Sequence, residues 1–277
     1  MNYRHAFHAG NFADVFKHIV LTRILTYLNL KDAPYRVIDT HAGLGRYKLT
    51  SDEARRTGEA QRGVFRFAKA RFAADVEALL APYRTLIAPA IDADGYYPGS
   101  PEIAARLTRP QDRLTLSELH PRDAMKLRNH FYTDARIAIL ERDGYQILKA
   151  STPPNERRGL VLIDPPFEEG DEFLSLRAAL AEAYRKWPTG IYALWYPIKP
   201  DGIAQNFLAA IAASGMPKLL ALELMIDSRN DALGLPGCGL LIVNPPFVLA
   251  DEMQHCLAAL VKCLAPEHGS FRVATLT

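Results

Sequence analysis

Short apolar segments rich in β-branched residues alternate along the chain with longer segments in which apolar residues recur at helical spacing. Such alternation predicts an α/β fold, because each helix returns the chain to the edge where the next parallel strand begins. We therefore expect a seven-stranded, mostly parallel sheet with helices on its faces. The expected strands cover residues 35–47, 113–120, 135–145, 157–167, 189–198, 217–226 and 237–247.

The first helical segment, residues 11–30, places most of its large apolar side chains on one broad face. Asn11 is its expected N-cap, because a short polar side chain can accept a free amide of the first turn. Ser100 is expected to cap a second helix, with Pro101 at the first helical position. A short tail is expected to follow the last helix. The other expected helices cover residues 122–131, 145–150, 171–186, 200–214 and 251–264.

The segment 48–95 departs from this alternation. It is rich in Arg, Lys, Ala and Phe, has helical spacing, and contains no run typical of a strand. We interpret it as a helical subdomain inserted after the first strand. Residues 1–47 and 96–277 then form one main domain, and a chain of 277 residues is long enough to bury the core of both.

Charge is nearly balanced along the chain. Lys and Arg total 33, Asp and Glu total 31, and the net charge at pH 7 is +2. A strongly basic protein attracts nucleic acid over its whole surface, whereas this chain can do so only through a local basic patch.

Cysteine usage and hydropathy exclude several other classes of protein. The three cysteines form no CxxC pair and no Cys/His spacing typical of zinc, so we expect neither a metal site nor a disulfide framework. The N-terminal segment lacks the apolar core of a signal peptide, and the chain has no run of about 18 apolar residues. We expect a cytoplasmic protein without a membrane partner.

A glycine turn, DTHAGLG (39–45), follows the first expected strand. Glycine there lets the backbone approach a bound ligand, and the turn lies where ligands bind in open α/β sheets. The GxGxxG pattern of dinucleotide-binding proteins is incomplete, because Lys48 stands at the position of its third glycine. This favours a nucleoside cofactor without a pyrophosphate, such as S-adenosylmethionine, over NAD.

Acidic residues lie at the ends of the next two expected strands. Glu118 suits the ribose hydroxyls of such a cofactor, and Asp143, followed by Gly144, suits the surroundings of its adenine. The ribose acid usually lies about 20 residues beyond the glycines, and the inserted segment accounts for the longer separation here. Each acid alone also fits a surface charge or a turn, so the hypothesis depends on their order along the sheet.

The sequence VLIDPPF (161–167) ends the fourth expected strand with Asp-Pro-Pro-Phe, a pattern shared by enzymes that methylate exocyclic amino groups. The lone pair of an adenine amine is delocalised into the ring. The Asp164 carboxylate and a prolyl carbonyl can accept its two N–H bonds and direct that lone pair toward a methyl donor. The prolines stiffen the turn and remove competing amides. Phe167 can stack on the base. Catalysis is then mostly a matter of positioning the amine toward the methyl donor. Asp164 can hold the released proton.

A near-copy, LIVNPPF (241–247), contains equally suitable residues. The last expected strand forms a hairpin with the sixth strand and runs antiparallel to the rest of the sheet. Its carboxyl end therefore emerges at the opposite edge from the cofactor. We interpret Asn244 as a structural strand end and expect Phe247 to pack under the following helix. The loop 227–236 is expected to face the substrate instead.

Several segments together resemble the RlmJ family, adenine N6-methyltransferases of 23S ribosomal RNA that are named for adenine 2030. The resemblance extends from Tyr3 to about Pro246, and the N-terminal phrase and YYPGSP are its most specific parts. The segments that carry it are YRHAFHAGNFADVFKH, DTHAGLGRY, YYPGSP, SELHP, the DG pair at 143–144, LIDPPF and GIYALWYP.

The resemblance implies a Rossmann-like class I methyltransferase with a helical insertion, acting as a monomer and using S-adenosylmethionine. By motif position, Asp164 is the catalytic residue, and Tyr3 faces the RNA. Phe167 departs from the family, which usually has Tyr there, so the role of a hydroxyl is in doubt. The residues that the resemblance assigns to the cofactor are His18, His41, Ser100, Glu118, Asp143, Gly144 and Asp164.

From the residues alone, His18 also fits a packed helix residue, and Tyr3 a loose terminus. The target adenine must be unpaired or flipped to reach such a pocket. Two alternatives stay open: an amino methylase acting on DNA adenine or a protein glutamine amide, and an RNA-binding protein without catalysis. A basic cluster in the insertion suits phosphates or a solvated helix face. Its members are Arg55, Arg56, Arg62, Arg66, Lys69 and Arg71.

Overall fold

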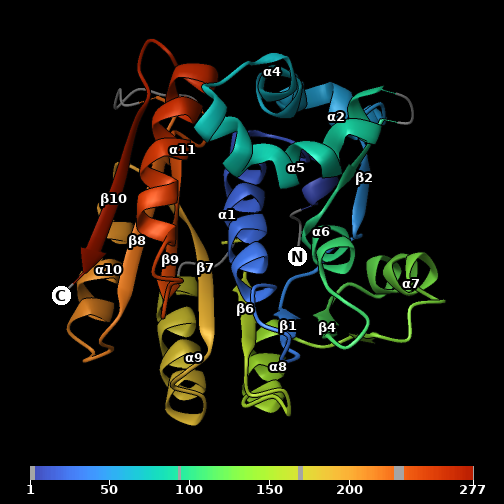
Figure 1. Ribbon diagram of the computed structural model, residues 1–277, viewed down its shortest axis with the longest axis vertical. Helices are drawn as coiled ribbons and strands as arrows, with labels where there is room; N and C mark the ends of the chain where they lie inside the picture. Colours follow the sequence, from blue (N-terminus) through green and yellow to red (C-terminus); the bar gives the residue numbers. More distant parts are fainter. Residues whose placement is uncertain (1–3, 93–94, 168–170, 228–233, 277) are drawn as a thin grey trace.

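The computed structural model describes residues 4–92, 95–167, 171–227 and 234–276. Its centre is an eight-stranded sheet with helices on both faces (Figure 1). From one edge to the other, the strands are β10 (Ser270–Leu276), β8 (Leu219–Met225), β9 (Gly237–Val243), β7 (Ile191–Ile198), β6 (Gly159–Ile163), β1 (Arg36–Asp39), β4 (Arg113–Ser117) and β5 (Ile137–Leu140).

Strand directions agree with the predicted architecture. The strands β5, β4, β1, β6 and β7 pair in parallel with one another, in that order. The strand β9 runs antiparallel between β7 and β8, as expected for the last strand. This is the Rossmann-like sheet of a class I methyltransferase with its reversed strand, so the predicted fold class is confirmed.

The sequence analysis missed the eighth strand, β10, which pairs antiparallel with β8 at the edge of the sheet. Residues 270–276 were expected to be part of a short tail. An edge strand is covered on few sides, and none of the side chains of β10 is fully buried. Its mixture of polar and apolar residues therefore carried little strand signal.

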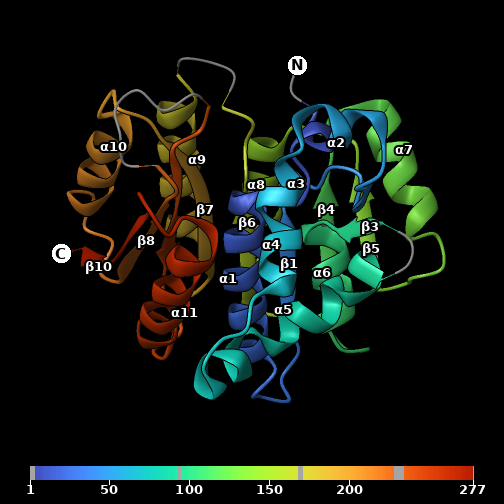
Figure 2. The same ribbon diagram turned by 90° about the horizontal axis from the view of Figure 1, so that it is seen from above.

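Two layers of helices cover the sheet (Figure 2). Alternate residues of one strand serve the two layers, because Val37 packs in the core beneath α1 and Ile38 in the core beneath α8. One layer contains α1 (Phe12–Leu28), α6 (Ser100–Leu107) and α11 (Leu249–Leu264), with α7 (Pro121–His130) near the edge. The other contains α8 (Gly144–Ser151), α9 (Glu172–Lys186) and α10 (Ile203–Ala212).

The helix α1 is buried on nearly every side, whereas the sequence pattern predicted one apolar face. Asn11 caps it as expected, with its side chain accepting a hydrogen bond from the Asp14 amide at 2.9 Å. The polar residues Asp14, Lys17 and His18 are at most 5% exposed. They are buried because helices of the inserted segment lie across the outer side of α1 (Figure 1).

The inserted segment is helical, as predicted. Val64, Phe67 and Leu80 belong to the same buried cluster as the side chains of α1. The two short strands β2 (Arg46–Lys48) and β3 (Tyr96–Pro98) pair where the segment leaves and rejoins the main body. Its division from the rest as a separate domain stays a prediction. The helices are α2 (Asp52–Thr57), α3 (Glu59–Arg62), α4 (Val64–Lys69) and α5 (Ala74–Asp92).

Within the described ranges, no helix combines the length and the apolar character needed to cross a membrane. The parallel strands place the residues that follow them along one edge of the sheet. The glycine turn after β1, Glu118 after β4, Asp143 after β5 and Asp164 after β6 therefore share that edge.

Candidate active site

The glycine turn after β1 is shaped by two residues with positive φ, Gly43 at 63° and Gly45 at 79°. A Cβ atom on Gly43 would lie 2.2 Å from the Tyr47 hydroxyl, so no larger residue fits without moving the tyrosine. The Gly43 amide donates to Glu118 Oε2 at 2.8 Å. The turn is therefore tied directly to the acid at the end of β4.

Glu118 and Asp143 are both held by backbone amides. Glu118 accepts from the amides of Gly43 and His120, and burial raises its pKa although these bonds oppose the rise. Asp143 caps α8 by accepting from the Gln146 amide at 3.0 Å. Gly144 lies so close to the turn that a Cβ atom would be 2.4 Å from the Thr40 carbonyl oxygen. Both acids are thus fixed beside the glycine turn.

Asp39 ends β1 as a carboxylate that is only 1% exposed. Burial raises its pKa to about 6, and the charge of Asp164 adds to the rise, while a hydrogen bond from Ser100 opposes it. The Ser100 hydroxyl donates to Asp39 Oδ2 at 2.7 Å. Ser100 was expected to be an N-cap, but Gly99 holds that position and the serine side chain points to Asp39 instead.

His41 follows Asp39 in the turn, and its ring lies among the buried groups of the site. Burial lowers its pKa to about 4, against the opposing charges of Asp164 and Asp143. Its ring is therefore neutral near pH 7. Its Nδ1 atom lies 2.8 Å from the Thr40 hydroxyl oxygen.

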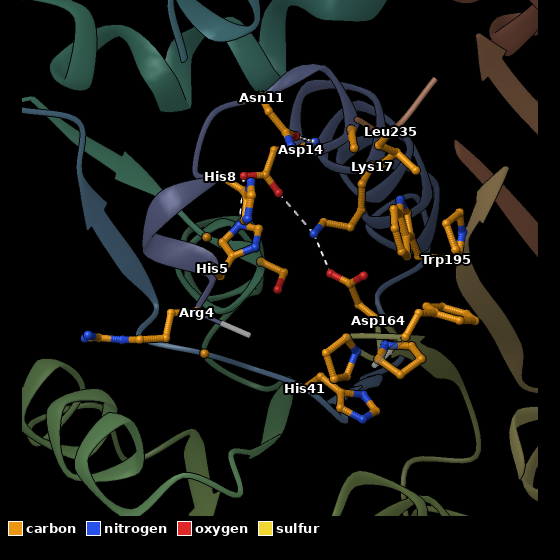
Figure 3. Close-up of a pocket in the computed structure, with 18 of the residues that line it drawn as sticks. Arg4, His5, His8, Asn11, Asp14, Lys17, His41, Asp164, Trp195 and Leu235 are labelled. Atoms are coloured by element: carbon orange, nitrogen blue, oxygen red, sulfur yellow. Dashed lines mark hydrogen bonds and ion pairs between the residues drawn. The ribbon is translucent and has the colours of Figure 1, made fainter. Parts of the chain in front are cut away.

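Asp164 follows β6 directly, and its Oδ2 atom accepts a hydrogen bond of 2.5 Å from Lys17 Nζ. The Lys17 ammonium also lies 3.1 Å from Asp14 Oδ1. Figure 3 shows Lys17 pointing between the two carboxylates. Sequence reasoning missed Lys17. A signal was present, because Asp14, Lys17 and His18 recur at helical spacing on one side of an otherwise apolar helix.

Two histidines near Asp14, His5 and His18, make further polar contacts. His5 Nε2 lies 2.9 Å from Asp14 Oδ2. On the other side, His18 Nδ1 lies 2.7 Å from the Tyr97 hydroxyl. Burial lowers the pKa of His18 to about 3, and the charge of Lys17 adds to this, although Asp14 opposes it. Its buried Nε2 atom has no hydrogen-bond partner among the described residues.

Aromatic side chains form the wall beside Asp164. The Phe167 ring lies 4.7 Å from the ring of Phe173 and 5.7 Å edge-on from Trp195, measured between centroids. Phe167 has a φ of 49°, a conformation that few residues other than glycine adopt. The backbone at Phe167, in the turn after β6, is therefore strained.

Most of these groups line one cavity of about 1130 Å³, with Asp39, Tyr97 and Phe173 packed outside its lining. Tyr3 lies outside the described residues. The structure brings the other residues predicted for the site together, although the role of each stays a prediction. Those that line the cavity are His18, His41, Ser100, Glu118, Asp143, Gly144, Asp164 and Phe167.

Basic side chains lie on the part of the cavity wall that the N-terminal segment and the insertion provide. Of the six basic residues predicted in the insertion, Arg62 and Arg66 line the cavity, and Arg4 of the N-terminal segment also lines it. Lys199 contributes a positive charge from the loop after β7. The described residues of the 227–236 loop also line the cavity, as predicted; residues 228–233 lie outside the described part.

The second Pro-Pro-Phe sequence lies at the opposite edge of the sheet, as predicted from the reversed direction of β9. The Asn244 amide donates to the carbonyl oxygens of Pro188 and Gly190, at 2.8 and 2.7 Å. The expected packing of Phe247 under a helix is wrong, because its side chain is 84% exposed and contacts the edge of Tyr27. The turn after β9 directs it outward.

Among the described residues, no group of three or more His, Cys, Asp or Glu side chains is arranged to hold a metal ion. The polar groups of the cavity form hydrogen bonds and ion pairs with one another.

Comparison with known proteins gives a family match. A family model described as "Ribosomal RNA large subunit methyltransferase D, RlmJ" matches residues 32–277. A Haemophilus influenzae protein named ribosomal RNA large subunit methyltransferase J is 42% identical over 282 residues, covering 100% of this chain and 99% of the relative. The Escherichia coli protein of the same name is 42% identical over 269 residues, covering 96% and 95%.

A solved structure supports the same match. A protein from Legionella pneumophila is 34% identical and superposes with a TM-score of 0.88, covering 98% of this chain and 99% of that one. The insertion and the reversed strand therefore lie within a fold that this relative shares over nearly its whole length.

Proposed function

The chain belongs to the RlmJ family of ribosomal RNA large subunit methyltransferases, and on this premise we propose that it methylates the exocyclic N6 amine of an adenine in 23S ribosomal RNA. The methyl donor is S-adenosylmethionine, and the family resemblance names adenine 2030 as the target. The enzyme acts as a cytoplasmic monomer. The observation that carries the proposal is the position of Asp164, whose carboxylate shares one cavity with the glycine turn.

The cavity fits S-adenosylmethionine in three respects. Gly43 lines the cavity without a side chain, so a ligand can approach its backbone closely. Glu118, held by two amides, presents a carboxylate suited to ribose hydroxyls. The buried Nε2 atom of His18 has no partner among the described residues, and a bound ligand can satisfy it. In this assignment the cofactor residues are those predicted from the sequence.

Asp164 and the following proline hold the substrate amine. Asp164 Oδ2 is engaged by Lys17, which leaves Oδ1 to accept one N–H of the amine. The Pro165 carbonyl accepts the other N–H, and neither proline has an amide to compete. With both hydrogens held, the nitrogen lone pair localises on the side that faces the methyl donor. The cation beside Asp164 fixes which oxygen remains for the substrate.

The transfer is an in-line displacement. When bound, the cofactor supplies an activated methyl group on a sulfonium sulfur, which leaves as a neutral thioether. The N6 nitrogen forms the new N–C bond as the C–S bond breaks, and one N–H proton departs by way of Asp164. Phe167, held against Phe173 and Trp195, stacks on the adenine and fixes its plane. The protein contributes orientation, which is the larger part of catalysis here.

The RNA strand follows the basic wall of the cavity. Arg62 and Arg66 are exposed and line the cavity, so they can meet phosphates while the flipped base enters. Arg55 and Arg56 belong to the same insertion but do not line the cavity. This difference provides a matched pair of variants.

The RNA assignment is tested by charge reversal. We expect Arg62→Glu with Arg66→Glu to weaken binding to a 23S fragment at least tenfold and to reduce the salt slope of log K by about two, since each phosphate contact contributes about one. The matched control is Arg55→Glu with Arg56→Glu, which we expect to change affinity less. Equal losses in both variants, measured across a salt series, would remove this wall from the interface.

The activity itself is tested by mapping the product. Labelled S-adenosylmethionine is incubated with the enzyme and naked 23S RNA, adenine-containing DNA or ribosomal protein, followed by digestion and mass spectrometry. We expect label in N6-methyladenosine of the RNA, at one nucleotide. Label in DNA or in a glutamine amide instead would contradict the proposal and favour the other class of amino methylase.

A further inference from the structure

Asp14 is a buried carboxylate that connects His5 of the N-terminal segment to Lys17 and, through Lys17, to Asp164. It lies in the first turn of α1 and is only 1% exposed. Its Oδ2 atom accepts from the Gly10 amide at 2.9 Å and lies 2.9 Å from His5 Nε2. Its Oδ1 atom lies 3.1 Å from Lys17 Nζ. Figure 3 shows Asp14 between Lys17 and His5, the first residue of η1 (His5–Phe7), with Lys17 pointing toward Asp164.

Asp14 is held in its ionised form. Burial alone would raise its pKa, but the interactions with His5 and Lys17 outweigh burial and leave the pKa well below its usual range. Burying a charge is unfavourable unless partners compensate for it. Asn11 already caps α1. Capping therefore does not explain why position 14 carries a charge.

The charge of Asp14 acts on Lys17. The Lys17 ammonium lies between two carboxylates, 3.1 Å from Asp14 and 2.5 Å from Asp164. The ammonium is attracted to Asp14 on one side and donates to Oδ2 of Asp164 on the other. A lysine side chain has several rotatable bonds, so an ammonium paired with a single carboxylate can move between the two oxygens of that carboxylate.

We propose that Asp14 is a positioning residue for methyl transfer. It fixes Lys17 so that one oxygen of Asp164 stays available to the substrate amine. It also connects His5 to this series of interacting side chains. The inference rests on the proposed function. It assigns Asp14 no contact with the RNA or the cofactor. The placement of η1 and the geometry at Asp164 are thereby coupled through one side chain.

Asp14→Asn tests this role, because the amide oxygen can still accept from the Gly10 amide while the charge is lost. The matched control is Glu102→Gln on α6, which also neutralises a buried carboxylate, one that is 7% exposed and paired with Arg106 and His130. Glu102 does not line the cavity. Both variants lose an ion pair, but only Asp14→Asn alters the contacts that lead through Lys17 to Asp164.

The readouts are kcat and KM on a 23S RNA fragment, the Tm, and the Kd of S-adenosylhomocysteine. We expect Asp14→Asn to lower kcat at least tenfold, with KM and Kd within about twofold of wild type. Glu102→Gln is expected to lower the Tm with kcat unchanged. Asp14→Glu restores the charge on a longer side chain, so its kcat is expected to fall between those of wild type and Asp14→Asn.

The outcomes separate the two hypotheses. Absence of turnover by the wild-type enzyme contradicts the proposed function. Wild-type turnover together with an unchanged kcat in Asp14→Asn overturns the positioning role, as does a loss of kcat that Glu102→Gln matches. If Asp14→Asn does not fold, Asp14→Ser, which also removes the charge, decides: a kcat reduced at least threefold supports the role, and a wild-type kcat overturns it.

Discussion

The side chains at the candidate active site work as pairs whose charges or hydrogen bonds limit one another. Lys17 engages one oxygen of Asp164, and Ser100 engages Asp39 behind it. Phe167 is held by two aromatic rings and by a turn with positive φ. Two features of the site are energetically unfavourable: the buried carboxylate of Asp39 and the strained backbone at Phe167. Both lie in or beside the same cavity.

Phe167 provides a prediction about substrate binding. Stacking of a base on an aromatic side chain contributes about 1–3 kcal/mol by alanine substitution. We therefore expect Phe167→Ala to raise the KM for RNA or lower kcat/KM roughly tenfold or more. Phe167→Tyr keeps the ring and should stay close to wild type, which would show that the hydroxyl found in the family is dispensable. Steady-state kinetics on one RNA fragment checks both, and equal activity of all three enzymes would remove Phe167 from the base site.

Asp39 provides a prediction about pH. Its pKa in the folded protein is about 6, above the ordinary value of 3.8, so the folded state holds the proton more tightly than the unfolded state does. The stability that this contributes is complete below about pH 4 and is lost as the pH rises through about 6. The loss is about 2–3 kcal/mol at most.

We expect Asp39→Asn to be more stable relative to wild type at pH 7.5 than at pH 4.5, since the amide never ionises. Urea unfolding at both pH values measures the difference. A difference that is the same at both pH values, or larger at pH 4.5, would contradict the raised pKa. Ser100→Ala is a useful companion, because it removes the hydroxyl that donates to this carboxylate.

Residues that end strands could be predicted from the sequence, and residues that meet through tertiary packing could not. Asp164 and Glu118 follow apolar runs, so strand order places them. Lys17 lies 147 positions before Asp164, and their contact depends on how α1 crosses the sheet. Ser100 was assigned to its own helix cap because only local capping could be inferred, whereas its partner is Asp39, 61 positions away.

At the scale of elements, α1 carries the site because the inserted helices bury it. The pattern of apolar residues predicted its position and N-cap, but the burial of Asp14, Lys17 and His18 requires the cover that residues 52–92 provide. An insertion that covers a helix from outside leaves no periodic signal in that helix. The edge strand β10 escaped prediction for the converse reason, since little covers it.

Gly63 provides a prediction about how the insertion contacts the N-terminal turn. A Cβ atom there would lie 2.1 Å from the Gly10 carbonyl oxygen and 2.6 Å from the Asn11 carbonyl carbon, both backbone atoms. We expect Gly63→Ala to destabilise the protein by about 1–3 kcal/mol and to increase amide hydrogen exchange in residues 4–14. Methyl transfer should fall with it, since the clash is with Gly10 and the Gly10 amide donates to Asp14.

Gly58→Ala is the control for Gly63→Ala. Gly58 has a φ of 62° and nothing within 4 Å of an added Cβ, so this variant adds backbone strain without a clash. We expect it to cost about 1 kcal/mol and to leave exchange in the N-terminal turn unchanged. Increased exchange in both variants would indicate general loosening of the insertion, not a specific contact at Gly63.

At the scale of the whole molecule, strand polarity separates two similar sequences into different roles. The run of parallel strands brings Asp164 to the edge that holds the glycine turn, while the reversed β9 takes Asn244 to the far edge. This arrangement was predictable, because it follows from strand order alone. The exposure of Phe247 was not, since it depends on the turn after β9.

The far edge carries its own stability prediction. Asn244 donates two hydrogen bonds to carbonyl oxygens and has a φ of 54°, which asparagine tolerates better than alanine does. We expect Asn244→Ala to lower the free energy of unfolding by about 1–3 kcal/mol, measured by urea titration. Its kcat, corrected for the folded fraction, should remain within about twofold of wild type.

The most direct test compares Asp164→Ala with Asn244→Ala in one assay of labelled methyl transfer from S-adenosylmethionine to 23S RNA. The account predicts that Asp164→Ala loses transfer by several orders of magnitude while its Kd for S-adenosylhomocysteine changes little, and that Asn244→Ala retains transfer. Persistent transfer by Asp164→Ala, with loss in a folded Asn244→Ala enzyme, would place the chemistry at the opposite edge of the sheet.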